Sequence, residues 1–190
     1  MKRIVLLISF IAAIGLCASA QTYIDFHQMP IARTPAPMPD NFPEGMYLAW
    51  DNFFYVTPGI WNGEGPGFWV DPTTQHNIVA FVGGPLCDLA ATCHGSIKLM
   101  VGPNVTAFTP VQIQVTAGWL PNRVIVTAYS NGRFVGRTTW NLTTDPQTFT
   151  FPNAWSDLTQ LIFTPEFVHT NSIYPPAGSM LIYKLVLMMH

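Results

Sequence analysis

The stretch Val124–Leu142, VIVTAYSNGRFVGRTTWNL, decides the fold because it places two strand-like segments on either side of a two-residue turn. Asn131 and Gly132 are residue types that tolerate the positive φ angles of a type I′ turn, whose twist matches that of paired antiparallel strands. Such a turn fixes the register, so that Tyr129 faces Phe134. We therefore expect a tight antiparallel hairpin.

The two faces of a regular hairpin in this register differ in charge. One face carries Arg133 and Arg137, and the other carries no charge. Burying an unpaired arginine costs several kcal/mol, more than the roughly 1–3 kcal/mol that one buried valine returns. The charge-free face is therefore predicted to point to the core. It consists of Ile125, Thr127, Tyr129, Phe134, Gly136, Thr138 and Trp140, whereas Val124, Val126, Ala128 and Val135 share the arginine face.

The rest of the chain repeats this strand-like pattern. The segments are short, rich in β-branched and aromatic residues, and bounded by Gly, Pro, Asn or Asp, which is typical of an antiparallel β-sandwich with minimal helix. In the last segment, 179–188, alternate residues point to opposite faces, and one of these faces contains Lys184. The other face is therefore predicted to point to the core, and it consists of Leu181, Tyr183, Leu185 and Leu187. The other segments are 22–26, 47–56, 76–83, 95–102, 109–119, 147–152 and 158–165.

Residues 1–20 have the pattern of a secretory signal peptide. A basic start at Lys2 and Arg3 precedes an apolar run, and Ala18, Ser19 and Ala20 form a small-residue cleavage site. No later apolar run approaches the roughly 20 residues of a membrane span. We therefore expect a secreted, extracellular protein.

Residues 21–190 are enough for one β-sandwich domain. Five prolines lie between residues 30 and 43, so we expect an extended surface crossing over residues 27–46. Without the leader, six basic and ten acidic residues remain, a formal charge of about −4 that gives no reason to expect nucleic acid as a partner.

Cysteine and asparagine motifs fit the expected extracellular location. Cys87 and Cys93 remain after the leader, and an oxidising compartment favours a disulfide between them. A four-ligand zinc site would need more partners than His94 nearby. Asn104 and Asn141 head two glycosylation sequons beside turn-like residues, although such triplets also occur by chance.

The order of elements resembles a family of small secreted β-sandwich proteins, mostly fungal and mostly uncharacterised, that are similar to lectin-type or carbohydrate-binding jelly rolls. The resemblance rests on TYIDF, YLAWDNFFYV, HNIVAFVGG, the hairpin stretch and FTFPNAWSDLTQLIFTP, and it covers most of the mature chain. It implies a jelly-roll-like sandwich that binds carbohydrate, with Trp155 as a core aromatic that flanks a strand.

The same resemblance raises the question of a structural calcium ion. In similar jelly rolls, an acidic first strand and a later Asp-Asn pair can hold calcium. Asp25 matches the first half, but Tyr183 and Lys184 stand where the pair would fall. A lysine would oppose an ion that needs six to eight oxygen ligands, so no cofactor is expected.

Aromatic residues in the loops are the predicted ligand-binding residues. Sugars present a flat C–H face ringed by hydroxyl groups, so their sites combine an aromatic ring with a few amides or carboxylates. The alternative is that these aromatics pack the loops onto the sandwich. The candidates are Trp61, Asn62, Glu64, Trp69, Trp119 and Tyr174.

No catalytic residue is predicted. A glycoside hydrolase needs two carboxylates about 5 to 9.5 Å apart, and most acids of this chain lie in turn contexts, as in Asp71-Pro72 and Asp145-Pro146. Glu64 and Asp88 are the first pair to test. The sequence has no G-x-S-x-G motif, and its histidines are scattered singly.

These observations leave three functions. The first is a secreted non-catalytic carbohydrate-binding module that acts on cell-wall or extracellular glycan, the second is a secreted structural or adhesion-type protein without glycan binding, and the third is a glycan-degrading enzyme. Sparse acidic residues and the sandwich pattern favour the first.

Overall fold

The structure is a computed structural model of the 190-residue chain. It describes residues 21–39, 42–44, 46, 48–51, 53–60, 67–69, 79–82, 97–101, 107–118, 120–166 and 180–190. Over these residues the only helix is the three-residue 3-10 turn η1, Phe26–Gln28. The strands are β1 Gln21–Asp25, β2 Ala36–Pro37, β3 Leu48–Asp51, β4 Phe53–Val56, β5 Val79–Val82, β6 Ile97–Val101, β7 Phe108–Ala117, β8 Asn122–Ser130, β9 Arg133–Leu142, β10 Gln147–Thr150, β11 Gln160–Glu166 and β12 Met180–Met189.

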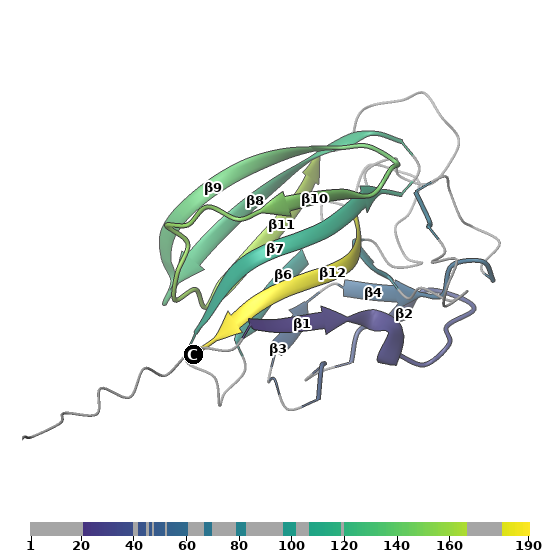
Figure 1. The fold of residues 1–190 in the computed structure, drawn as a ribbon, viewed down its shortest axis with the longest axis horizontal. Coiled ribbons are helices and arrows are strands. Elements are labelled where there is room, and N and C mark those ends of the chain that lie inside the picture. Colours follow the sequence, from purple (N-terminus) through teal and green to yellow (C-terminus); the bar gives the residue numbers. More distant parts are fainter. Residues whose placement is uncertain are drawn as a thin grey trace, which may run out of the picture.

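The strands form two antiparallel sheets (Figure 1). The larger sheet, sheet A, has seven strands in the order β10-β7-β12-β5-β4-β2, and β1 pairs with the same edge of β12 as β5. Sheet B has five strands in the order β3-β6-β11-β8-β9. From β5 to β12 the chain changes sheet at every connection except the β8–β9 hairpin, as in a jelly roll. The predicted all-β antiparallel sandwich with minimal helix is confirmed.

Aromatic side chains fill the space between the two sheets. Phe53, Phe108 and Phe163 are at most 1% exposed, and Phe163 contacts the rings of Phe53 and Trp140 at centroid distances of 6.4 and 6.2 Å. Trp155, predicted to be in the core, is 4% exposed. Edge-to-face and offset contacts of this kind suit the quadrupoles of the rings and add to the free energy gained from apolar burial.

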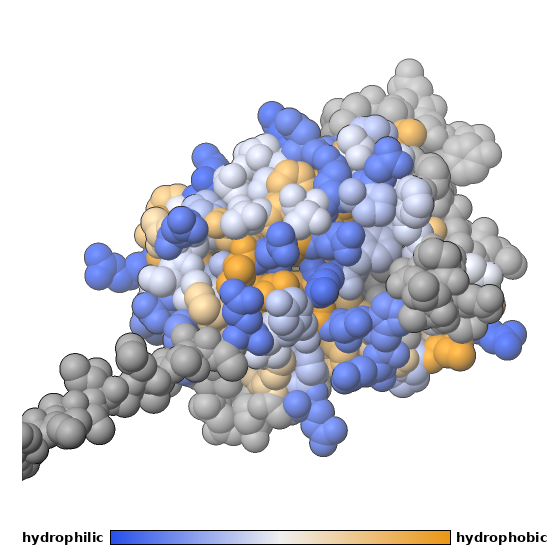
Figure 2. All heavy atoms as spheres, viewed as in Figure 1, coloured by the Kyte–Doolittle hydropathy of each residue, from blue (hydrophilic) through white to orange (hydrophobic). Residues whose placement is uncertain are grey.

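The outer face of sheet A is mixed in polarity. On β10, Phe149 packs against Trp140 in the core, whereas Thr148 and Thr150 are exposed, as alternation along a strand predicts. The side of the molecule seen in Figure 2 carries hydrophilic side chains spread among smaller apolar areas. No helix in the described part of the chain is long and apolar enough to cross a membrane.

The N-terminal segment is joined to sheet A. Strand β1 pairs with β12 over five residues, and the predicted crossing over residues 27–46 contains β2, which pairs with β4. This crossing also contributes to the core with side chains that are at most 8% exposed, namely Met29, Ala32, Met38 and Phe42.

The predicted turn of the β8–β9 hairpin is confirmed. Asn131 and Gly132 have φ angles of 48° and 76°, as a type I′ turn requires. The flanking pair is Ser130 with Arg133, and Tyr129 then faces Phe134 as expected.

The predicted core face of the hairpin is wrong for β8 and for Phe134. Val124, Val126 and Ala128 are fully buried, while Phe134 is 62% exposed. The reason is a β-bulge: Tyr129 pairs with Phe134, but Ala128 pairs with Gly136, so Val135 is an extra residue. Beyond the bulge, the residues of β9 therefore change faces relative to β8. Trp140 lies opposite Val124 and shares its face, whereas the regular hairpin would place it on the face of Ile125. Arg133 and Arg137 are exposed, as the charge argument required.

A second bulge divides the predicted core face of β12. Leu185 and Leu187 are in the main core as predicted, but at the start of the strand Met180 and Ile182 take these positions. Ile182 pairs with Val115 and Lys184 with Gln114, which leaves Tyr183 as the extra residue. The alternation therefore changes phase at Tyr183, and Leu181 with Tyr183 belongs to a smaller cluster outside the main core.

Candidate binding site

Trp69 is the one predicted ligand-binding residue that lies in the described part of the chain, and it is 43% exposed. Its indole Nε1–H donates to the carbonyl of Thr144 at 2.7 Å, and its backbone N–H donates to the hydroxyl of Tyr183 at 2.7 Å. Both ends of the residue are therefore tied to the sandwich. The ring is held in one orientation while part of its surface stays open to solvent.

Glycine at position 67 allows this segment to approach β7 closely. A Cβ atom on Gly67 would lie 1.7 Å from the carbonyl oxygen of Ala117, so no side chain fits. The Gly67 N–H donates to the carbonyl of Gly118 at 2.9 Å. Its carbonyl accepts bonds from the hydroxyls of Thr116, at 2.9 Å, and Tyr183.

An apolar cluster supports the same segment. Phe68 is 8% exposed and joins Val56 and Leu181, with Phe54 and Tyr183 packed against them. Phe68 therefore anchors the segment to sheet A, and its neighbour Trp69 is left at the surface. Small satellite clusters under a loop are a common way to fix a loop on a sheet.

The turn between β9 and β10 forms the other side of the site. The Thr143 N–H donates to Oε1 of Gln147 at 2.7 Å, and the Thr143 carbonyl accepts from the N–H of Ala117 at 2.7 Å. The Asp145 N–H donates to the Thr143 hydroxyl at 3.3 Å, and the Asp145 side chain is exposed. An exposed carboxylate thus follows directly after Thr144, which holds the indole.

The structure tests only some of the predicted site residues. Trp61, Asn62, Glu64, Trp119 and Tyr174 lie outside the described residues, as do Cys87, Cys93 and Asn104. Asn141 and Thr143, the ends of the second sequon, are exposed. Glycosylation of Asn141 stays a prediction.

Asp25 has local partners in the structure. Its Oδ1 accepts from the His27 N–H at 3.0 Å and contacts the His27 ring nitrogen Nδ1. Lys184, weighed against calcium in the sequence, pairs directly with Asp25 across β1 and β12. Among the described residues there is no group of three or more His, Cys, Asp or Glu side chains that could hold a metal ion.

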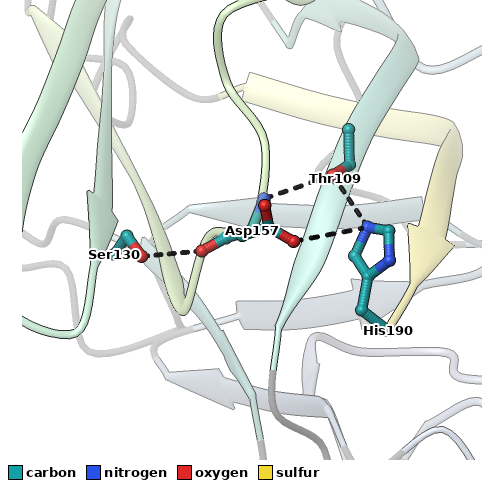
Figure 3. A network of polar contacts seen from close by, with 4 residues as sticks. All are labelled: Thr109, Ser130, Asp157 and His190. Carbon is teal, nitrogen blue, oxygen red and sulfur yellow. Dashed lines mark hydrogen bonds and ion pairs between the residues drawn. The ribbon is translucent and has the colours of Figure 1, made fainter.

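A polar network that sequence reasoning did not predict joins four distant residues (Figure 3). The Thr109 hydroxyl lies 2.9 Å from Nε2 of His190, and Oδ1 of Asp157 lies 3.9 Å from the same atom. The Ser130 hydroxyl donates to the Asp157 carbonyl at 2.7 Å. In a catalytic triad the hydroxyl and the carboxylate contact opposite ring nitrogens, whereas here both contact Nε2. The arrangement is therefore that of a tether between the ends of β7, β8 and β12.

Asp145 and Asp157 do not form a hydrolase pair. Asp145 follows the end of β9, whereas Asp157 contacts Ser130, which pairs with the first residue of β9. Ten residues of strand span about 30 Å, far beyond the roughly 5–9.5 Å between the carboxylates of a glycosidase. Glu64 and Asp88 lie outside the described residues.

Comparisons with known proteins give little more. No protein-family model matches the chain, and no curated protein matches it. A solved structure described as "CBM4 structure and function" matches 90% of this chain and 88% of its own chain, with 14% sequence identity and a TM-score of 0.32. A likeness this loose carries no argument about the fold or the ligand of this chain.

Proposed function

We propose that the chain is a secreted, non-catalytic carbohydrate-binding β-sandwich that holds glycan against the indole of Trp69. The observation that carries the proposal is that Trp69 is 43% exposed although both of its N–H groups are bonded to the sandwich. A ring that serves only to pin a loop would gain more free energy from full burial.

The chemistry of the site suits a sugar. The exposed part of the indole offers an apolar surface for the C–H face of a pyranose ring. The exposed Asp145 carboxylate, one residue beyond the carbonyl that holds the indole, can accept hydrogen bonds from sugar hydroxyls. Trp61, Asn62 and Glu64 precede Trp69 by at most eight residues, and we include them in the same proposed site.

The tethers also favour binding energetically. Association costs free energy for each side chain that must be ordered, about 0.5–1.5 kcal/mol for a side chain with many rotamers. Trp69 is already ordered by its bonds to Thr144 and Tyr183. Little of the gain from sugar stacking is therefore lost to ordering the ring.

The test is retention of the mature protein by immobilised glucans, xylan, chitin and mannan, compared with Trp69→Ala and Tyr23→Ala. The open part of the indole is about 100 Å², so its loss should cost about 2 kcal/mol, or about thirtyfold in Kd. Tyr23 is the matched control because it is 58% exposed on the outer face of sheet A, beneath Lys184.

We expect Tyr23→Ala to bind as the wild type does. Trp69→Ala should stay folded with a melting temperature lower by about 10 °C, because the covered part of the indole and its bond to Thr144 are lost as well. Equal binding by Trp69→Ala and the wild type would contradict the proposed site. Absence of retention of the wild type on every glycan would instead favour the structural or adhesion-type alternative.

A further inference from the structure

The outer face of sheet B carries an aromatic pair near the tip of the β8–β9 hairpin, made of exposed Phe134 and half-buried Tyr129. The rings of Tyr129 and Phe134 are 6.1 Å apart between centroids and 75° apart in orientation. Phe134 is 62% exposed, and the adjacent Val135 is 37% exposed. The bulge at Val135 is what turns Phe134 out of the phase of the core-facing residues of β9.

Exposure of Phe134 gives no benefit to the stability of the fold. Burying a phenylalanine side chain is worth about 1.5–3 kcal/mol, and most of that is not realised here. Exposed aromatic rings beside polar groups are common in ligand sites, because a rigid ring can cover apolar ligand surface at a small cost in conformational entropy.

The register of the sheet places hydrogen-bonding side chains beside this pair. Tyr129 pairs with Phe134 on one side and Gln160 on the other, and in the adjacent row Thr127 pairs with Arg137. Neighbouring rows on one face of a sheet are about 7 Å apart, within reach of long side chains. We define the aromatic–arginine patch as Thr127, Tyr129, Phe134, Arg137 and Gln160.

Arg137 gives this patch a positive charge. Arg137 is exposed on the patch, and Arg133, next to Phe134 in the chain, is exposed as well. In the part of the chain that the structure describes, neither arginine forms an ion pair with an acidic side chain. An exposed guanidinium presents a planar pair of N–H donors that matches a carboxylate in a bidentate geometry.

We propose that the aromatic–arginine patch binds a saccharide that carries carboxylates, such as a polyuronate chain. The Tyr129 and Phe134 rings contact the C–H surface of the sugar, Arg137 pairs with a uronate carboxylate, and Thr127 and Gln160 bond to hydroxyl groups. An acidic peptide would satisfy the arginines but would leave the rings without a flat C–H partner. A neutral glycan would leave the arginines without an anion.

This site is separate from the one at Trp69. The indole of Trp69 is bonded to Thr144, two residues beyond the end of β9, whereas Phe134 is the second residue of that strand. The eight residue-to-residue steps from Phe134 to Leu142 alone span about 25 Å. The inference therefore does not rest on the proposed function at Trp69 and can hold without it.

The test is calorimetric titration of the mature protein with oligogalacturonate and with its methyl-esterified form, which keeps the sugar and removes the charge. We expect measurable binding of the acid form and at least about tenfold weaker binding of the ester. Arg137→Gln and Phe134→Ala should each weaken binding of the acid form at least about tenfold. Arg33→Gln, which removes an exposed arginine next to β2 on the other sheet, should bind as the wild type does.

Further control experiments distinguish binding at the aromatic–arginine patch from simple charge attraction and from binding at Trp69. Trp69→Ala should bind oligogalacturonate with the affinity of the wild type. The two proposed binding sites are therefore tested independently of each other. Equal affinity for poly-glutamate or dextran sulfate would show that charge alone is recognised and would overturn the proposal. Absence of oligogalacturonate binding, or unchanged binding by both Arg137→Gln and Phe134→Ala, would overturn it as well.

Discussion

Substitution of Gly67 by alanine is the sharpest perturbation of the segment that holds Trp69. The new Cβ would lie 1.7 Å from the Ala117 carbonyl oxygen and 2.9 Å from the Gly118 carbonyl oxygen. These neighbours are backbone atoms of β7 and its end, so they cannot rotate away as a side chain would. The segment must therefore move off sheet A.

The magnitude follows from the bonds that such a movement breaks. Gly67 takes part in three hydrogen bonds, with the Gly118 carbonyl and with the hydroxyls of Thr116 and Tyr183, each worth about 1 kcal/mol. Exposure of Phe68, now 8% exposed, adds about 2 kcal/mol if the ring leaves its cluster. The expected loss is therefore about 3–5 kcal/mol, or about 10 °C in melting temperature for a domain of this size.

Gly132→Ala is the matched control for the Gly67 experiment. Gly132 has a φ of 76° with nothing within 4 Å of the added Cβ, so alanine there costs only backbone strain, about 1 kcal/mol. Urea and thermal unfolding of both variants measure the difference. If Gly67→Ala loses no more stability than Gly132→Ala, the close packing of the segment on β7 is wrong, and so is the basis for a fixed Trp69.

Three further predictions test the core, the contact of Gly136 with Trp155 and the predicted disulfide. Phe163→Ala should lower the free energy of unfolding by about 3–5 kcal/mol in a urea titration, because the ring is fully buried between two other aromatic rings; a loss below 1 kcal/mol would contradict this. Gly136→Ala should cost about 1–3 kcal/mol by the same measurement, because its Cβ would lie 2.5 Å from Nε1 of buried Trp155; an unchanged midpoint would argue against this contact. In protein produced through an oxidising compartment, Cys87 and Cys93 should resist thiol labelling under denaturing conditions until a reductant is added, and immediate labelling of both would exclude the disulfide.

Sequence reasoning reached the fold because the hairpin and the strand pattern are local signals. Asn131 and Gly132 specify the turn, and their φ angles are those expected. The partner of each sheet edge is not a local property: nothing in the short Ala36–Pro37 segment indicates that it pairs with β4. The contacts among Thr109, Asp157 and His190 likewise arise only when three distant segments meet at one end of the sandwich.

The two face assignments that failed have the same physical cause. Both assumed strict alternation, and in each strand one inserted residue changes the phase, Val135 in β9 and Tyr183 in β12. A bulge leaves composition and hydrophobic pattern almost unchanged, so a period-two analysis cannot locate it. The charge argument still held for Arg133 and Arg137, because the cost of burying them does not depend on the register.

Both bulges also lie at the two proposed ligand sites. The extra residue Tyr183 is the one whose hydroxyl links Gly67 to Trp69, and the extra residue Val135 is the one that places Phe134 on the outer face of sheet B. With regular strands, Tyr183 would take the phase of Leu185 in the core, and Phe134 would take the phase of Gly136 and Trp140. Sequence rules assume regular strands and a well-packed core. They are expected to fail at functional sites, where a strand departs from that regularity.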